Sequence, residues 1–187
     1  MISINQLKNG MAIKLDGELY TVLEFHPIKP GKGAAFVRTR LKNMRMKTVI
    51  DRTFKSSDKL EDVFIETKKI RYLYRSGEMY YFMDQETYEE MPFSKEDIVE
   101  AIDFLKDDME ITVSLCEGKV VDVAPPIFVE LKVEYTEPGL KGDTARSGTK
   151  QARLETGMTI QVPLFVETGD IVKMDTRIRG YVSRGHS

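Results

Sequence analysis

The feature that most constrains this 187-residue chain is an alternation of apolar and polar side chains, repeated every second residue and interrupted by short glycine turns. Residues 12–15 and 18–25 flank Asp16-Gly17, a dipeptide that favours a tight hairpin because both central turn positions need a positive φ. Comparable pairs of alternating segments meet near Ser76-Gly77, Glu117-Gly118 and Gly169-Asp170. The pattern predicts an all-β protein built from antiparallel hairpins.

These segments fall into three consecutive groups of about 60 residues, each rich in short strands. A polar stretch, residues 55–62, closes the first group, and Pro125-Pro126 marks the end of the second because two consecutive backbone donors are missing there. Short antiparallel sheets need closure to remove their edges. We therefore predict three small β-barrels, with domain bounds at 1–64, 65–127 and 128–187.

One segment departs from this period. Ser94 followed by Asp97 resembles a helix N-cap with a capping acid, and Ile98, Ile102 and Leu105 then recur at helical spacing. Residues 94–108 are accordingly predicted to form the one sizeable helix of the chain.

The charge is small overall but uneven along the chain. A net charge of -2 and a pI near 5.8 argue against a protein that coats nucleic acid through bulk positive charge. Residues 1–64, 65–128 and 129–187 carry +5, -8 and +1. A basic end and an acidic middle can orient a molecule on a charged partner, or they can be ordinary surface variation.

The chain reads as a cytosolic protein without a membrane contact. Cys116 is the single cysteine and has no internal disulfide partner, which suits a reducing cytoplasm. No stretch approaches the roughly 18 apolar residues of a membrane span, and the first residues do not resemble a secretion signal. No metal-binding, nucleophile or dinucleotide motif occurs, so we expect neither a metal nor a cofactor.

A basic hairpin stands out at residues 26–43, HPIKPGKGAAFVRTRLKN. Pro30 and Gly31 fit the two central positions of a type II turn, and Gly33 adds backbone freedom beyond Lys32. The following strand is predicted to have one buried face and one basic face. The buried set is Val37, Thr39 and Leu41; the other is Phe36, Arg38, Arg40 and Lys42.

Several interpretations compete for Lys32. A solvated lysine in a surface turn is the plainest of them. A phosphate-binding P-loop is rejected because Gly33 and Ala34 follow where Ser or Thr is needed, and a nucleophilic lysine needs a desolvated site that an exposed tip does not offer. The remaining interpretation is a narrow charged probe that enters a crevice in a polyanion. Behind it, phosphates would be held by Arg38, Arg40, Lys42 and Arg45.

The chain resembles the bacterial elongation factor P family, relatives of the hypusine-bearing translation factor of eukaryotes and archaea. The resemblance is carried in order by HPIKPGKGAAFVRTRLKN, YLYRSGEMYYFMDQETYEE, TEPGLKGDTARSGTKQARLETG, VPLFVETGD and DTRIRGYVSR. It implies an SH3-like, KOW-type domain followed by two OB-folds in an L-shaped arrangement that mimics tRNA. It also implies a non-enzymatic factor that binds both ribosomal subunits, between the peptidyl and exit tRNA sites, and relieves stalling at consecutive prolines.

The same resemblance assigns roles to residues. Lys32 matches the tip residue that lies beside the acceptor end of the peptidyl-tRNA, against ribosomal RNA, and that a separate enzyme extends covalently in many members. Gly142, Asp143 and Thr144 match a loop that faces the exit-site codon, although their sequence alone favours a glycine turn with an Asx-type hydrogen bond. Tyr181 and Arg184 match a surface near the peptidyl-tRNA or small subunit, or are simply exposed strand-end residues.

Other functions stay open at this point. A general RNA-binding OB or KOW protein would use Lys32 as one contact among many. A paralogue within the family would have a narrower role, and an enzyme would need a site that the motifs do not offer. A monomer is the default expectation.

Overall fold

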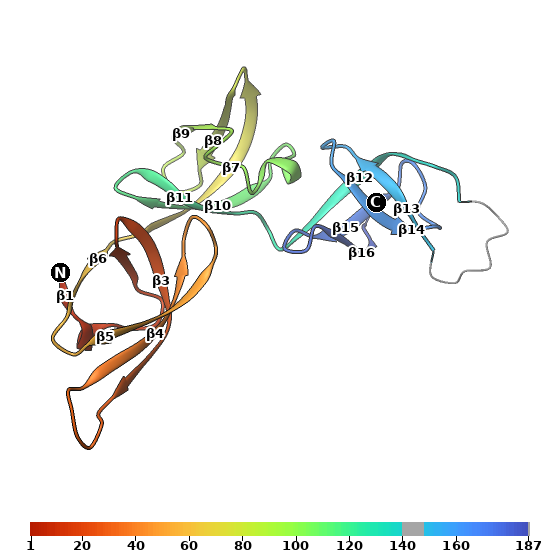
Figure 1. The fold of residues 1–187 in the computed structure, drawn as a ribbon. Coiled ribbons are helices and arrows are strands. Elements are labelled where there is room, and N and C mark those ends of the chain that lie inside the picture. Colours follow the sequence, from red (N-terminus) through yellow and green to blue (C-terminus); the bar gives the residue numbers. More distant parts are fainter. Residues whose placement is uncertain (140–147, 187) are drawn as a thin grey trace. The chain divides into compact units, whose positions relative to one another are not determined.

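The computed structural model describes residues 1–139 and 148–186, in which strands far outnumber every other element (Figure 1). They form three separate sheets, which confirms the predicted all-β class. By spatial contact the chain divides into two compact units, Met1–Thr67 with Ser114–Asp122 and Lys68–Val113 with Val123–Ser187. In the part of the chain that is described, no helix has the length and apolar character needed to cross a bilayer.

The first sheet is antiparallel and has the order β1-β6-β2-β3-β4-β5. Asp16 and Gly17 have φ of 52° and 84°, so the predicted tight hairpin between β2 and β3 is confirmed. The elements are β1 (Ile2–Ser3), the 3-10 turn η1 (Ile4–Gln6), β2 (Ala12–Leu15), β3 (Glu18–Ile28), β4 (Phe36–Asn43), β5 (Val49–Lys55) and β6 (Lys59–Val63). Their inner faces form one core of Ile4, Leu7, Ile13, Val22, Val37, Leu41, Phe54 and Leu60.

The second and third sheets share one topology. Their orders are β11-β10-β7-β8-β9 and β14-β13-β12-β15-β16, so each sheet has its first strand at the centre and its third and fifth strands at the two ends. In the third sheet the end strands β14 and β16 also contact each other, which closes the sheet into a barrel. A five-stranded barrel with this order is the OB-fold arrangement.

The bounds of these strands follow the predicted hairpins closely. The second sheet comprises β7 (Glu66–Ser76), β8 (Met79–Asp84), β9 (Glu90–Ser94), β10 (Glu110–Cys116) and β11 (Lys119–Ala124). The third comprises β12 (Phe128–Thr136), β13 (Thr149–Leu154), β14 (Thr159–Pro163), β15 (Ile171–Asp175) and β16 (Gly180–Arg184). Between β11 and β12 lies Pro125-Pro126, where no strand forms.

The predicted helix at residues 94–108 is wrong. Ser94 ends β9, and the rest of the segment contains turns and one short 3-10 turn, η2 (Ile102–Phe104). The Asp97 amide does donate to Ser94 Oγ at 3.3 Å, as the capping pattern suggested. Ile98, Ala101 and Phe104 are buried, a spacing of three that suits tight turns, whereas a helix would bury residues three and four apart. A cap therefore formed without the helix that it usually begins.

Candidate nucleic-acid interface

The candidate site begins at the hairpin formed by β3 and β4, which projects beyond the rest of the first sheet (Figure 1). The cross-strand pairs Glu24–Arg40, His26–Arg38 and Ile28–Phe36 are each symmetric about residue 32. Lys32 is therefore the midpoint of the hairpin, and residues 29–34 around it are all exposed. The sequence-based prediction that Lys32 is displayed at the tip agrees with this position.

The tip does not form the predicted type II turn. Gly31 lacks the positive φ that such a turn requires at its second central position, and Gly33 has a φ of 114° instead. The chain reverses through a bend over residues 31–33. Gly33 is thus the tip residue whose backbone conformation requires glycine, whereas a Cβ at Gly31 would meet nothing within 4 Å.

The strand behind the tip has the predicted division into two faces. Val37, Thr39 and Leu41 are buried, and Arg38, Arg40 and Lys42 are exposed on the opposite face. Arg45 is also exposed but lies in the turn after β4, at the end of the strand farthest from Lys32. The four predicted cations therefore run along the hairpin and do not surround its tip.

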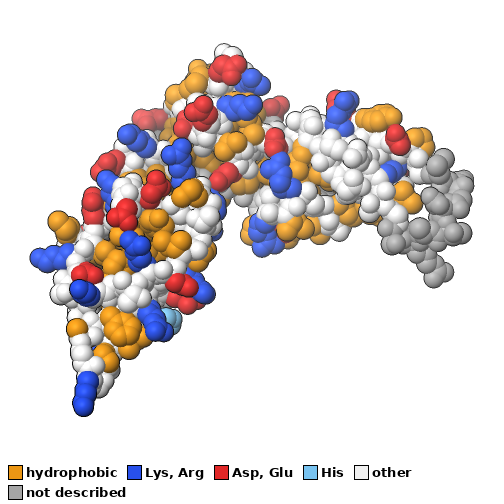
Figure 2. Space-filling view, in the orientation of Figure 1, with side chains coloured by type: hydrophobic (Ala, Val, Ile, Leu, Met, Phe, Trp, Pro, Cys, Tyr) orange, Lys and Arg blue, Asp and Glu red, His pale blue; other side chains and the backbone are white. Residues whose placement is uncertain are grey.

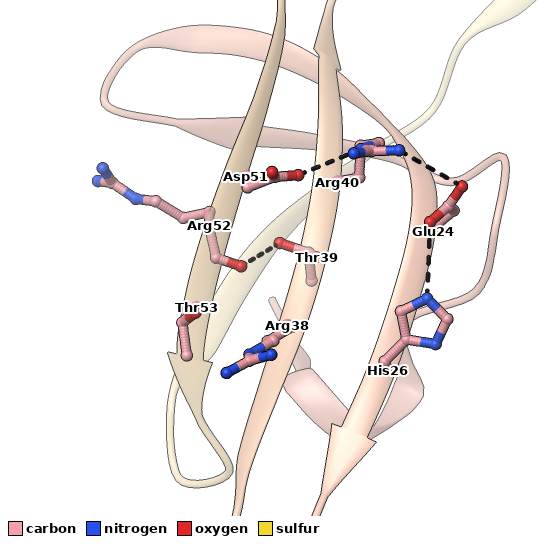
Figure 3. Close-up of a pocket in the computed structure, with 8 residues that line it drawn as sticks. All are labelled: Glu24, His26, Arg38, Thr39, Arg40, Asp51, Arg52 and Thr53. Atoms are coloured by element: carbon pink, nitrogen blue, oxygen red, sulfur yellow. Dashed lines mark hydrogen bonds and ion pairs between the residues drawn. The ribbon is translucent and has the colours of Figure 1, made fainter.

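A shallow hollow of about 420 Å³ lies on this basic face, across β3, β4 and β5 (Figure 3). Arg40 lies between two carboxylates, with Nε 3.2 Å from Asp51 Oδ1 and a terminal nitrogen 3.9 Å from Glu24 Oε1. The second oxygen of Glu24 lies 3.6 Å from His26 Nε2. The full lining is Glu24, His26, Arg38, Thr39, Arg40, Asp51, Arg52 and Thr53.

The cations around this hollow differ in how far their charge is already balanced. Arg40 is shared by Glu24 and Asp51, and Arg52 points away from the hollow and pairs with Asp16 at 3.2 Å (Figure 3). Arg38 instead lies over the ring of Phe36, 5.8 Å from its centroid. Within residues 1–139 and 148–186 no ion pair involves Lys32, Arg38 or Lys42, so these three keep their charge available to a polyanion.

Glu24, His26 and Asp51 also belong to the site, and the sequence did not predict them as members. They belong to β3 and β5, and only the pairing register brings them beside Arg38 and Arg40. The signal was present in the symmetry of the hairpin, because counting outward from Lys32 pairs residue 26 with 38 and residue 24 with 40. Without a known midpoint that register could not be chosen.

The other predicted site residues lie elsewhere. Arg184 ends β16, where its guanidinium contacts the Phe165 carbonyl oxygen at 3.2 Å and Asp170 Oδ2 at 3.6 Å and lies over the Phe165 ring. Tyr181, in the same strand, is half-buried opposite Met174. Gly142, Asp143 and Thr144 lie outside the described residues. Among the described residues no cluster of His, Cys, Asp and Glu could hold a metal ion.

Figure 2 shows acidic and basic side chains interleaved over the surface in view, with a basic side chain at the far end of the projecting hairpin. A basic hairpin on one β-sheet, combined with two sheets of OB order, is an arrangement suited to nucleic acid. The fold and site together define a multi-domain β-protein of the nucleic-acid-binding class.

Comparison with known families refines this class. The model "Elongation factor P (EF-P) KOW-like domain" matches residues 3–60, "Elongation factor P (EF-P) OB domain" matches 65–123, and "Elongation factor P, C-terminal" matches 129–184. The chain belongs to the elongation factor P family, whose members are translation elongation factors.

Individual relatives agree over the full length. The chain is 52% identical over 184 residues to elongation factor P of Moorella thermoacetica and 50% identical to that of Acetivibrio thermocellus, in both cases over 98% of this chain and 100% of the relative. The relative from Caldanaerobacter subterraneus is 49% identical with the same coverage.

Solved structures extend the likeness to archaea and eukaryotes. Eukaryotic translation initiation factor 5A from Methanococcus jannaschii aligns with a TM-score of 0.51 and 26% identity, over 66% of this chain and 91% of that one. An initiation factor 5A family protein from Naegleria fowleri aligns with a TM-score of 0.50 at 17% identity, over 66% of this chain and 96% of that one, and supports the fold alone.

Proposed function

We propose that this chain binds the ribosome between the peptidyl and exit tRNA sites and promotes peptide bond formation at consecutive prolines. The observation that carries this proposal is the position of Lys32. It is the exposed midpoint of a projecting hairpin and has no ion pair among the described residues. A slender tip of this kind can enter a crevice in RNA that excludes the sheet behind it, and membership of an elongation factor family supplies the ribosomal context.

The physical role of such a tip is to position a substrate. Proline is a hindered and conformationally restricted nucleophile, so a misplaced peptidyl-tRNA end wastes the geometry that reaction requires. An ammonium group that binds RNA oxygens at the acceptor end restricts that motion and restores a reactive arrangement. The protein itself makes and breaks no bond under this proposal and is not an enzyme.

The basic face behind the tip would hold RNA phosphates. Arg38 and Lys42 are the strongest candidates because no carboxylate among the described residues forms an ion pair with them, whereas Arg40 shares its charge with Glu24 and Asp51. Arg45 would contact RNA farther from the tip. Ribosomal RNA and the peptidyl-tRNA are the proposed partners of this face, in the cytoplasm and with a monomeric factor.

The other residues that the family resemblance singles out are also proposed to contact the ribosome or its RNAs. Gly142, Asp143 and Thr144 would face the exit-site codon. Tyr181 and Arg184 would lie near the peptidyl-tRNA or small subunit. Arg184 could contact RNA only with the edges of its guanidinium that Phe165 and Asp170 leave uncovered.

A covalent extension of Lys32 by a separate enzyme is part of the proposal. Extension by several atoms would lengthen the reach of the tip while the sheet stays outside the crevice. Intact-mass measurement of the chain from its native host tests this directly. A mass above that of the sequence, localised to Lys32 by fragmentation, is expected. An unmodified mass would remove the extended reach but not the positioning role.

A stalling reporter in cells that depend on this chain tests the function. Lys32→Ala is expected to lower read-through of a three-proline run by at least about tenfold, since a displaced reacting group can cost up to about a hundredfold in rate. Lys29→Ala is the matched control, because Lys29 is an exposed lysine of the same loop. A reporter without the proline run should be unaffected by either change.

The rival function, general RNA binding, gives a different pattern in the same reporter. If Lys32 were one contact among many, both substitutions would weaken RNA affinity modestly and equally, and neither would show a proline-specific defect. Equal effects of Lys29→Ala and Lys32→Ala would therefore favour the rival and reject the proposed mechanism.

A further inference from the structure

A second hollow, of about 480 Å³, lies on the third sheet and belongs to none of the positions discussed above. The end of β12 and the strands β13 and β14 form it, at the outer surface of the sheet. Its main lining residues are Tyr135, Glu137, Thr149, Lys150, Arg153 and Thr159.

An exposed aromatic ring forms part of this hollow. A register shift between Val133 and Tyr135 breaks the alternation of β12, so Glu134 and Tyr135 both face solvent. Tyr135 is 56% exposed and lies directly opposite Arg153, which in turn pairs with Thr159. An aromatic ring, a guanidinium and a hydroxyl thus form one row across three strands.

The two cations of the hollow are held in place but keep donors to spare. Arg153 donates from Nε to Glu134 Oε2 at 2.8 Å, and none of its terminal nitrogens has a described partner. Lys150 donates to the Glu137 backbone carbonyl at 2.6 Å, which occupies one of its three N–H groups. Both are therefore fixed in orientation and able to bind a further anion.

The position of this hollow in the third sheet also suits nucleic-acid binding. In the strand order of the third sheet, β13 and β14 are the second and third strands of an OB arrangement, and OB-folds bind oligonucleotides on the face of those two strands. An exposed aromatic ring beside cations is the usual combination for single-stranded nucleic acid, because a base stacks on the ring while phosphates bind the cations.

We propose that this hollow binds single-stranded RNA, with one base stacked on Tyr135 and a neighbouring phosphate held by Arg153 and Lys150. The hydroxyls of Thr149 and Thr159 and the amide of Gln151 line the same surface and can bond base edges or the 2′-hydroxyl. Duplex RNA does not fit because its bases are stacked on one another and present no free face. This hollow shares no residue with the Lys32 site, so either site can function without the other. In translation, both sites would bind RNA.

Fluorescence anisotropy of labelled hexauridylate with the full-length chain tests the site. Tyr135→Ala is expected to weaken binding by at least about fivefold, and Tyr135→Phe to stay within about twofold of the original because it keeps the stacking ring. Arg153→Gln should lower the slope of log affinity against log salt by about 0.7, as expected for one lost phosphate contact on a single strand.

A control variant separates this site from others. Tyr74→Ala removes a tyrosine of the second sheet that is 45% exposed and stacks on Tyr81, and it should leave binding unchanged. The proline-run reporter, which measures the Lys32 mechanism, is a separate readout, so failure here and failure of the proline mechanism are distinguishable. Unchanged affinity in Tyr135→Ala, or equally tight binding of a six-base-pair RNA duplex, would overturn the proposal.

Discussion

Lys32 owes its exposure to its neighbours. The residues on either side of Lys32 are glycines, which have no side chains to cover it. Strands β3 and β4, which lead to this tip, pair symmetrically about Lys32. The two glycines are not equivalent, because Gly33 has a φ of 114°, whereas the φ of Gly31 is not positive. The sequence alone assigned the special turn position to Gly31, since Pro-Gly is a strong local turn signal; the structure places it two residues later.

This difference makes the tip testable at single residues. Gly33→Ala is expected to lower the free energy of unfolding by about 1–3 kcal/mol or to distort the tip, because a side chain is strained at that φ. Gly31→Ala, the matched control, should change it by less than about 0.5 kcal/mol. Urea denaturation measures both, and equal destabilisation by the two changes would contradict the assigned tip conformation.

Asp84 is a second residue whose environment predicts a measurable effect. It is almost fully buried and accepts a hydrogen bond from Lys68 Nζ at 2.9 Å and from the amides of Glu86 and Thr87. The Lys68 hydrogen bond, with those amides, lowers the pKa of the Asp84 carboxyl from 3.8 to about 2.

Because the folded-state pKa of Asp84 is depressed, its contribution to stability is present above the unfolded value near 4 and is lost as the pH falls to about 2. Urea denaturation between pH 2 and 6 should show this loss in the original chain. Asp84→Asn should be less stable at pH 6 and should show a smaller decline toward pH 2. An identical decline in both proteins would show that Asp84 does not contribute to it.

At the scale of elements, the hairpins were predictable from sequence, whereas the one helix that the sequence predicts does not form. Tight β-turns depend on two or three adjacent residues, so pairs such as Asp16-Gly17 and Glu117-Gly118, with positive φ at all four positions, could be found from sequence. Residues 94–108 carry local helix signals, but the buried side chains there, Ile98, Ala101 and Phe104, are three residues apart, and tertiary packing overrides the signal. The members of the two hollows depend on cross-strand register, which local sequence does not specify.

The turn structure of residues 94–108 predicts which side chains matter. Phe104→Ala is expected to cost about 3–5 kcal/mol because the ring is buried, with 1% of its surface exposed. Val99→Ala should be nearly neutral because Val99 is 57% exposed. Denaturation of both variants measures this, and a large loss in Val99→Ala would indicate a different packing of the segment.

At the scale of the whole molecule, charge is distributed unevenly between the parts of the fold. The first 64 residues carry +5 and contain the projecting hairpin, whereas residues 65–128 carry -8 and contain the stacked tyrosines of the second sheet. A net charge of -2 does not attract RNA in bulk. The proposed RNA recognition would then come from local groups, namely Lys32 with its basic strand in the first sheet and Tyr135 with its cations in the third.

The most direct measurement is the single-turnover rate of peptide bond formation on ribosomes that hold a peptidyl-tRNA ending in proline, with prolyl-tRNA as the acceptor. If Lys32 positions the peptidyl-tRNA, Lys32→Ala lowers the stimulated rate by at least about tenfold and Lys29→Ala by less than about twofold, with no effect of either on a non-proline acceptor. A Lys32→Ala rate equal to that of the original chain, with ribosome binding intact, would contradict this positioning role.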